Sequence, residues 1–123
     1  MKLDHLQLAM PAGEEEKARR FFAGVFGMSE QQKPEPLASR GGCWFRKGSV
    51  ILHIGVDTPF VPQQKAHPAF IVEDLDSIER ALKERGHRVV WDDSLPNRKR
   101  FYTEDPFGNR IEILQEGDGF SQK

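Results

Sequence analysis

One pattern of elements is repeated in the sequence, and this repeat constrains the fold more than any other feature. Each copy begins with a strand, continues with an amphipathic helix ending at glycine, and passes through a loop into two or three further strands. Neither copy is long enough to close a core by itself, so the halves must pair, within one chain or between two. The repeat therefore predicts two β-α-β-β(-β) modules.

The first module is predicted over about residues 3–56. Alternation over residues 3–10 indicates a strand with one apolar face, and the glutamates at 14–16 open a helix that ends at Gly27. Residues 28–42 have the composition of a loop. Residues 43–46 and 50–56 are then predicted as two strands of a hairpin.

The second module is predicted over about residues 67–116, after a linker at 57–66. A strand over 67–73 precedes a helix with Asp74 as its N-cap and Gly86 beyond its end. Three more strands are expected, the last two joined by a turn at 104–109. Their ranges are 89–91, 100–103 and 110–115. Residues 1–123 are thus expected to form a single domain of two modules.

Charge and cysteine content exclude several classes of protein. The chain has 18 Lys and Arg against 19 Asp and Glu, a net charge of −1, so it has no overall positive field for nucleic acid or anionic lipid. The single Cys43 cannot form an internal disulfide, and no signal peptide or membrane-spanning stretch is evident. We expect a cytoplasmic protein that binds neither nucleic acid nor membrane.

Four side chains with metal-binding chemistry alternate with apolar residues in the predicted strands. If the aliphatic faces pack under the helices, all four point to the concave side of the sheet. The two side chains of each module are also similarly spaced. His5 and His53 lie 48 residues apart in the first module, and His67 and Glu112 lie 45 residues apart in the second. Imidazole with carboxylate suits Zn, Fe(II), Ni and Mn, so a divalent metal site is predicted. The four residues are His5, His53, His67 and Glu112.

Three motifs give the chain a resemblance to a known family. They are Asp4-His5-Leu6-Gln7-Leu8, His67-Pro68-Ala69-Phe70-Ile71-Val72 and the run from Tyr102 to Glu112, which contains Asp-Pro-Phe-Gly-Asn-Arg-Ile-Glu. With them the chain resembles the vicinal oxygen chelate superfamily over residues 3–116. That superfamily includes glyoxalase I, fosfomycin-resistance thiol transferases, extradiol dioxygenases and bleomycin-resistance proteins. The resemblance implies an α+β fold of two β-α-β-β-β modules, forming a cupped, mostly antiparallel sheet with helices on the outer face.

The resemblance also implies a site and a chemistry. His5, His67 and Glu112 match the common ligand triad, and His53 occupies a position that is a ligand in some members only. In this superfamily the metal chelates a substrate through neighbouring oxygens and stabilises a developing enolate or alkoxide. Glu112 would act as ligand and catalytic base. Tyr102 would be a second catalytic residue that also contacts the substrate, and Gln7 would contact the substrate as well. A homodimer is expected.

The reaction implied is that of a lyase, isomerase, transferase or dioxygenase acting on a small oxygen-rich molecule. The alternative is a metal-free small-molecule or antibiotic binder like the bleomycin-resistance proteins. Arg100, with Arg40, Arg98 and Lys99, is a candidate for binding an anionic substrate group.

Other reactive or aromatic residues are interpreted as structural. Cys43 has no neighbour in sequence that would activate it, and it is expected to pack in the core. His87 follows a predicted helix end and is assigned no chemistry. The aromatic side chains of Trp44, Phe45 and Trp91 are expected in the core rather than in a pocket.

Overall fold

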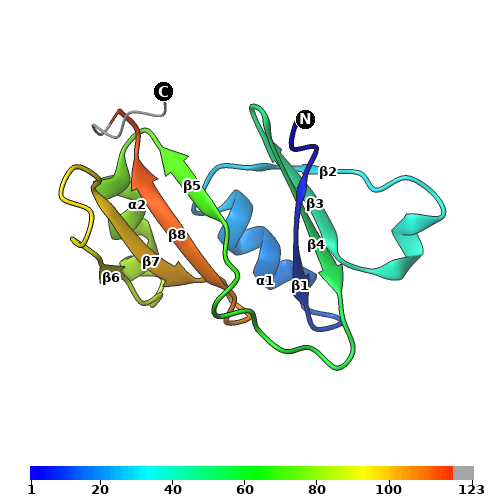
Figure 1. Cartoon of the computed structure of the whole chain (residues 1–123). Helices are drawn as coiled ribbons and strands as arrows, with labels where there is room; N and C mark the ends of the chain where they lie inside the picture. The colour runs from blue at the N-terminus through cyan, green and yellow to red at the C-terminus, as the bar shows by residue number, and fades with distance from the viewer. Residues whose placement is uncertain (118–123) are drawn as a thin grey trace. The chain divides into compact units, whose positions relative to one another are not determined.

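The computed structural model describes residues 1–117 (Figure 1). The chain divides into two compact units. Within the described residues, unit 1 contains residues 1–62 and the turn 105–109, and unit 2 contains residues 63–104 and 110–117. Each unit is built on its own four-stranded mixed sheet, so the predicted α+β class with two β-α-β-β-β modules is confirmed.

The sheet of unit 1 has the order β1-β4-β3-β2, with β1 parallel to β4 and the other two pairs antiparallel. Its alternating pattern places Leu52, Ile54 and Phe45 in the core, each at most 1% exposed. His53 and Trp44 consequently lie on the opposite face. The strands are β1 (Leu6–Met10), β2 (Ser29–Gln31), β3 (Cys43–Lys47) and β4 (Val50–Val56).

The first helix departs from its sequence prediction. An α-helix, α1 (Glu15–Ala18), passes directly into a π-helical turn, η1 (Arg19–Ala23), in which the Gly24 N–H donates to the Arg19 carbonyl. Phe21 and Phe22 are both buried in this turn, and Phe22 packs beside Phe45 of β3. A wide turn of this kind inserts one residue into the helical repeat, which the i, i+3, i+4 pattern does not reveal.

The predicted loop at 28–42 is only partly a loop. It contains the edge strand β2 and a short 3₁₀ turn, η2 (Leu37–Arg40). All three residues of β2 are exposed, so no apolar alternation marks this strand in the sequence. Its formation depends on pairing with β3, which local composition cannot show.

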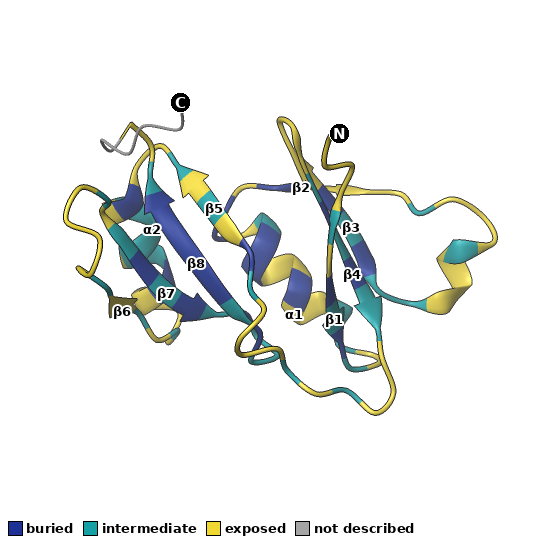
Figure 2. Cartoon of the chain, viewed as in Figure 1, coloured by how far each residue is buried: buried dark blue, intermediate teal, exposed yellow. Residues whose placement is uncertain are grey.

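The sheet of unit 2 repeats the topology, with the order β5-β8-β7-β6 and β5 parallel to β8. Figure 2 shows β8 buried along most of its length, whereas Ala69 and Ile71 of the edge strand β5 are exposed. The strands are β5 (Ala69–Val72), β6 (Val90–Trp91), β7 (Arg100–Glu104) and β8 (Arg110–Gln115). The strand predicted over 67–73 is therefore shorter, because Pro68 provides no backbone N–H for the ladder.

The helix of unit 2, α2 (Leu75–Glu84), has the predicted start and end. The Asp74 side chain accepts a hydrogen bond from the Ser77 N–H, and Gly86 adopts a φ of +82° beyond the last turn. Leu75 and Leu82 are buried on its inner face. Within residues 1–117, no helix combines the length and apolarity required to cross a bilayer.

Candidate functional site

The histidine pair of unit 1, His5 and His53, lies on the face of the sheet opposite the core. Their rings stack with centroids 4.2 Å apart, and the His53 ring stacks in turn on Trp44 at 3.9 Å with an interplanar angle of 2°. The strand register explains this arrangement, because Trp44 and His53 are directly opposed on β3 and β4. Three rings from three neighbouring segments thus form one stack.

Hydrogen bonding and charge define the state of the two histidines. His5 Nδ1 lies 2.8 Å from an Asp4 carboxylate oxygen, which orients the ring and leaves Nε2 available for another partner. Burial lowers the pKa of His53, and the neighbouring His5 lowers it further. Neutral imidazole is the form that binds a metal.

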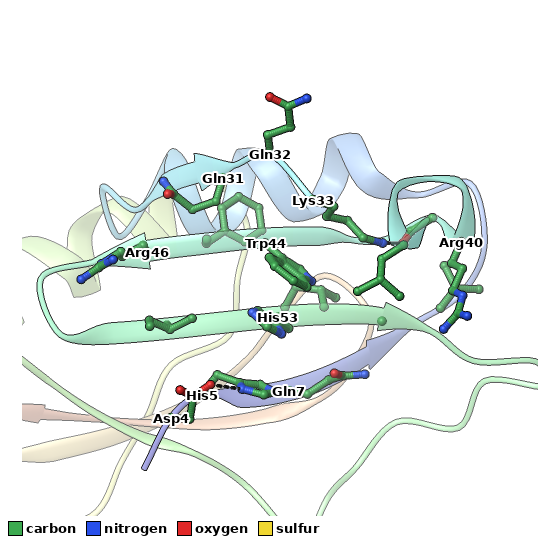
Figure 3. Close-up of a pocket in the computed structure, with 17 residues that line it drawn as sticks. Asp4, His5, Gln7, Gln31, Gln32, Lys33, Arg40, Trp44, Arg46 and His53 are labelled. Atoms are coloured by element: carbon green, nitrogen blue, oxygen red, sulfur yellow. Dashed lines mark hydrogen bonds and ion pairs between the residues drawn. The ribbon is translucent and has the colours of Figure 1, made fainter. Parts of the chain in front are cut away.

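A hollow of about 800 Å³ lies over this face of unit 1. Figure 3 shows the histidine pair, Gln7 and Trp44 along it, with Lys33 and Arg40 toward one end. Gln7 is opposite His53 in the register of β1 and β4, so the predicted substrate contact lies beside the histidine pair.

The carboxylate cluster of unit 2 comprises His67, Arg100, Tyr102 and Glu112. His67 Nε2 lies 3.0 Å from Glu112 Oε1, and an Arg100 terminal nitrogen donates to Glu112 Oε2 at 2.9 Å. The same Arg100 nitrogen donates to the Tyr102 hydroxyl at 3.3 Å. Strands β7 and β8 place Tyr102 directly opposite Glu112, which brings the two predicted catalytic residues together.

Every polar atom of the His67–Glu112 pair has a defined neighbour. His67 Nδ1 lies 2.9 Å from the Lys65 carbonyl oxygen, and because a carbonyl only accepts, Nδ1 carries the proton. Nε2 then faces Glu112 Oε1, and its contact with an ionised carboxylate requires a proton or a metal ion between the two atoms. Burial raises the pKa of Glu112, but the contacts with Arg100 and His67 outweigh it, and the net shift is downward.

Arg100 is itself held by a network. Its second terminal nitrogen donates to the Ser94 hydroxyl at 3.1 Å and lies 3.4 Å from an Asp92 carboxylate oxygen. Asp92 and Ser94 belong to the loop before β7, which sequence analysis did not single out. The sequence did contain a signal for this contact. Asp92 lies two positions before Ser94 in a short polar loop, and Asp and Ser side chains at this spacing commonly form local hydrogen bonds.

Two of the other predicted cations lie outside both groups. Lys99 pairs with Asp76 of α2 at 2.9 Å, and both side chains of this pair are exposed. Arg98 precedes it in the loop, where its backbone N–H donates to the Leu95 carbonyl. Arg40 does line the hollow of unit 1.

The aromatic residues correct one expectation. Phe45 is fully buried, as predicted, but Trp44 forms part of the hollow and Trp91 is 42% exposed. Strand alternation contained the signal for Trp44, because it shares its face with His53 whereas Cys43 and Phe45 face the core. Within residues 1–117, no group of three or more His, Cys, Asp or Glu side chains is arranged so that it could hold a metal ion.

The chain was compared with known protein families and with known proteins. Residues 2–113 match the family model described as the Glyoxalase/Bleomycin resistance protein/Dioxygenase superfamily. Comparison with curated proteins finds no match.

Among solved structures, a protein from Bacillus anthracis assigned to the glyoxalase family is 47% identical, with a TM-score of 0.88 and 94% of each chain covered. The fosfomycin resistance protein FosX from Listeria monocytogenes has a TM-score of 0.75 at 15% identity, covering 94% of this chain and 93% of its own. Lactoylglutathione lyase from Agrobacterium tumefaciens has a TM-score of 0.66 at 19% identity, covering 90% and 92%. The last two likenesses show the fold alone. The chain therefore belongs to the glyoxalase/bleomycin resistance protein/dioxygenase superfamily.

Proposed function

We propose that the protein is a divalent-metal-dependent enzyme acting on a small oxygen-rich molecule that is chelated through neighbouring oxygens. The observation that carries the proposal is the convergence of His67 Nε2 and Glu112 Oε1, 3.0 Å apart. Imidazole and carboxylate are the donor types that Zn, Ni, Mn and Fe(II) accept.

The residues present fit a metal ion because their outer atoms are already held. The Lys65 carbonyl fixes the His67 tautomer, and Arg100 occupies the far oxygen of Glu112. The Asp4 carboxylate likewise holds Nδ1 of His5. Outer contacts of this kind orient metal ligands and are characteristic of metal sites.

Each pair of ligands is incomplete by itself. A catalytic ion takes at least three protein ligands, so the proposal requires His5, and optionally His53, to serve the same ion as His67 and Glu112. The side chains would come from one chain or from two copies. Because ligands from two copies could share one ion, we propose that the protein is a homodimer. We also propose that it is located in the cytoplasm.

The chain's own residues have distinct roles in this reaction. A bound divalent ion supplies Lewis acidity to two neighbouring substrate oxygens. Glu112, ionised at neutral pH, is the group available to accept a proton. Tyr102 accepts a hydrogen bond from Arg100, so its own hydroxyl proton is available to a substrate oxygen. The two terminal nitrogens of Arg100 are engaged by Glu112 and Ser94, which favours a positioning role over direct substrate binding.

A second candidate function is metal-free binding of a small molecule. The hollow of about 800 Å³ over unit 1 favours it, because this volume suits a ligand whether or not an ion is bound. The two functions differ in one requirement, the metal.

Elemental analysis tests the proposal. Tag-free protein purified without chelator is compared with a His67→Ala, Glu112→Ala double variant and with a Lys83→Ala, Glu79→Ala variant, which removes an ion pair of α2 as a matched control. We expect a near-stoichiometric ion in the wild type and the control only. The identity of the ion selects the assay, with Fe(II) indicating oxygen chemistry, Ni or Zn isomerisation and Mn thiol transfer. Absence of an ion in all three proteins, even after each metal is added in turn, would leave metal-free binding as the function.

A further inference from the structure

The hollow over unit 1 has one end rich in hydrogen-bond donors and a middle formed by aromatic rings. We propose that it selects a flat aromatic carboxylate, with the acid group at Lys33 and Arg40 and the ring beside Trp44 and His53. This names the substrate class of the proposed enzyme and rests on that proposed function.

Charge within the hollow is positive although the whole chain has a net charge of −1. Lys33, Arg40 and Arg46 line it together with a single carboxylate, Asp4. Asp4 is already engaged by His5 at 2.8 Å. An anion would therefore meet attraction here, whereas a cationic ligand would not.

The cations of the hollow have no acidic partners in the part of the chain that the structure describes. Lys33 Nζ donates instead to the Gly41 carbonyl, a neutral acceptor, and is half-buried. Arg40 follows on the turn η2 and is exposed. Because both charges lack a carboxylate, a ligand acid group at this end displaces no existing ion pair. Such charge-assisted hydrogen bonds are about twice as strong as neutral ones.

Gln7 adds a third donor at the same end, and Gly55 leaves room for it. A Cβ at this position would lie 2.5 Å from Gln7 Nε2, so glycine allows the Gln7 side chain to lie flat across the sheet. Figure 3 shows the Gln7 amide extended toward the side of Arg40. An amide N–H is a suitable donor to a carboxylate oxygen.

The middle of the hollow is lined by aromatic rings that can contact the ring of a ligand. Trp44 and His53 stand parallel, 3.9 Å apart, and a π-system gains from stacked or edge contacts with such rings beyond simple burial. Ile51 completes the apolar surface. A carboxylate carried on an aromatic ring would combine the contacts of the acid-binding end with those of the rings.

A binding titration followed at one signal tests the proposal. In isotope-labelled, metal-free protein the indole N–H signal of Trp44 is identified by comparison with a Trp91→Phe variant, since the chain has two tryptophans. Benzoate is titrated beside benzamide, which lacks the charge, and cyclohexanecarboxylate, which lacks the flat ring. We expect benzoate to shift the Trp44 signal with a Kd below about 1 mM and each of the other probes to bind at least about tenfold more weakly.

Charge-removing variants locate the acid group. Lys33→Gln and Arg40→Gln should each weaken benzoate binding about tenfold or more, the loss expected of a charge-assisted hydrogen bond. Arg80→Gln removes an equal charge from the exposed side of α2 and should change nothing. Thermal unfolding of each variant verifies that it is folded. Equal binding of benzoate and benzamide, or equal losses in all three variants, would overturn the proposal.

The outcome is independent of the metal test. Benzoate binding at Trp44 without any stoichiometric metal would sustain this inference for the binding alternative and remove the enzyme. Metal binding without a benzoate shift at Trp44 would leave the proposed function and remove the aromatic carboxylate.

Discussion

Arg100 is the residue whose surroundings say most about its role. It contacts Glu112, Tyr102, Ser94 and Asp92, and its Nε is buried without a hydrogen-bond partner among the described residues. Its guanidinium spans the gap between the loop before β7 and the carboxylate. The geometry is that of a side chain that fixes Glu112 in place.

Replacing Arg100 is expected to weaken metal binding without abolishing it. Arg100→Met frees Glu112 Oε2 and should raise the metal Kd about 10- to 100-fold, the usual cost of losing an outer contact to a ligand. Arg100→Lys should recover part of the affinity. Isothermal titration with Zn measures both. The adjacent Lys99→Met variant, which removes an exposed pair with Asp76 and a contact of the Lys99 Nζ with the Trp91 ring, is the control. An unchanged Kd in Arg100→Met would show that Glu112 needs no such support.

Cys43 is expected to be unreactive in the folded protein. It is 1% exposed, and burial raises its pKa from 9.0 to about 11, so at pH 8 the thiolate is about 100-fold scarcer than in the unfolded chain. Because the unfolded thiol loses its proton first, the free energy of unfolding should fall as pH rises above 9. Alkylation rates with and without urea measure the first effect. Comparable rates in both states would contradict it.

At the level of elements, the turn between β7 and β8 depends on Asp105. This carboxylate is 3% exposed and accepts hydrogen bonds from the backbone N–H groups of Phe107 and Asn109 and from the Asn109 amide. Asn109 also donates to the Ala9 carbonyl of β1 at 2.9 Å. The most specific motif of the sequence is thus a structural turn of unit 1.

Asp105→Ala is therefore expected to destabilise the protein by about 2–4 kcal/mol, since three donors lose their acceptor in a buried place. Urea unfolding measures the difference. Asp93→Ala, at an exposed position in a loop, is the matched control and should change stability by less than about 0.5 kcal/mol. A loss in Asp105→Ala no larger than that of the control would show that solvent replaces these bonds.

The element pattern was largely predictable, and its exceptions have physical reasons. Alternation identified the faces of β1, β4 and β8 because apolar side chains must turn toward one core. The π-helical turn η1 and strand β2 were missed, since the first depends on packing of Phe21 and Phe22 and the second on pairing with β3.

The candidate site was predictable only in part. Sequence placed His5 and His53 on one face, and His67 and Glu112 likewise, and within each unit the structure brings the pair into contact. The stacking of Trp44 and the position of Lys33 were not predicted. Both arise from cross-strand register and the course of a loop, which local sequence does not fix.

At the scale of the whole molecule, metal binding should raise stability by mass action. Zn at 100 times its Kd is expected to add about 2.7 kcal/mol to the free energy of unfolding, provided the unfolded chain does not bind it. Thermal unfolding with and without Zn measures the shift, and the His67→Ala, Glu112→Ala variant should show none. An equal shift of the unfolding temperature in the variant would show that Zn binds at a site other than His67 and Glu112.

We propose that His5, His67 and Glu112 serve one ion. Co(II) has absorption bands that report its ligands, so titration of metal-free protein with Co(II) counts sites and identifies their geometry directly. We predict one ion per chain in the wild type and loss of the bands in both the His5→Ala and the His67→Ala variants, with His87→Ala unchanged. Retention of the wild-type bands in either His5→Ala or His67→Ala would contradict the shared site.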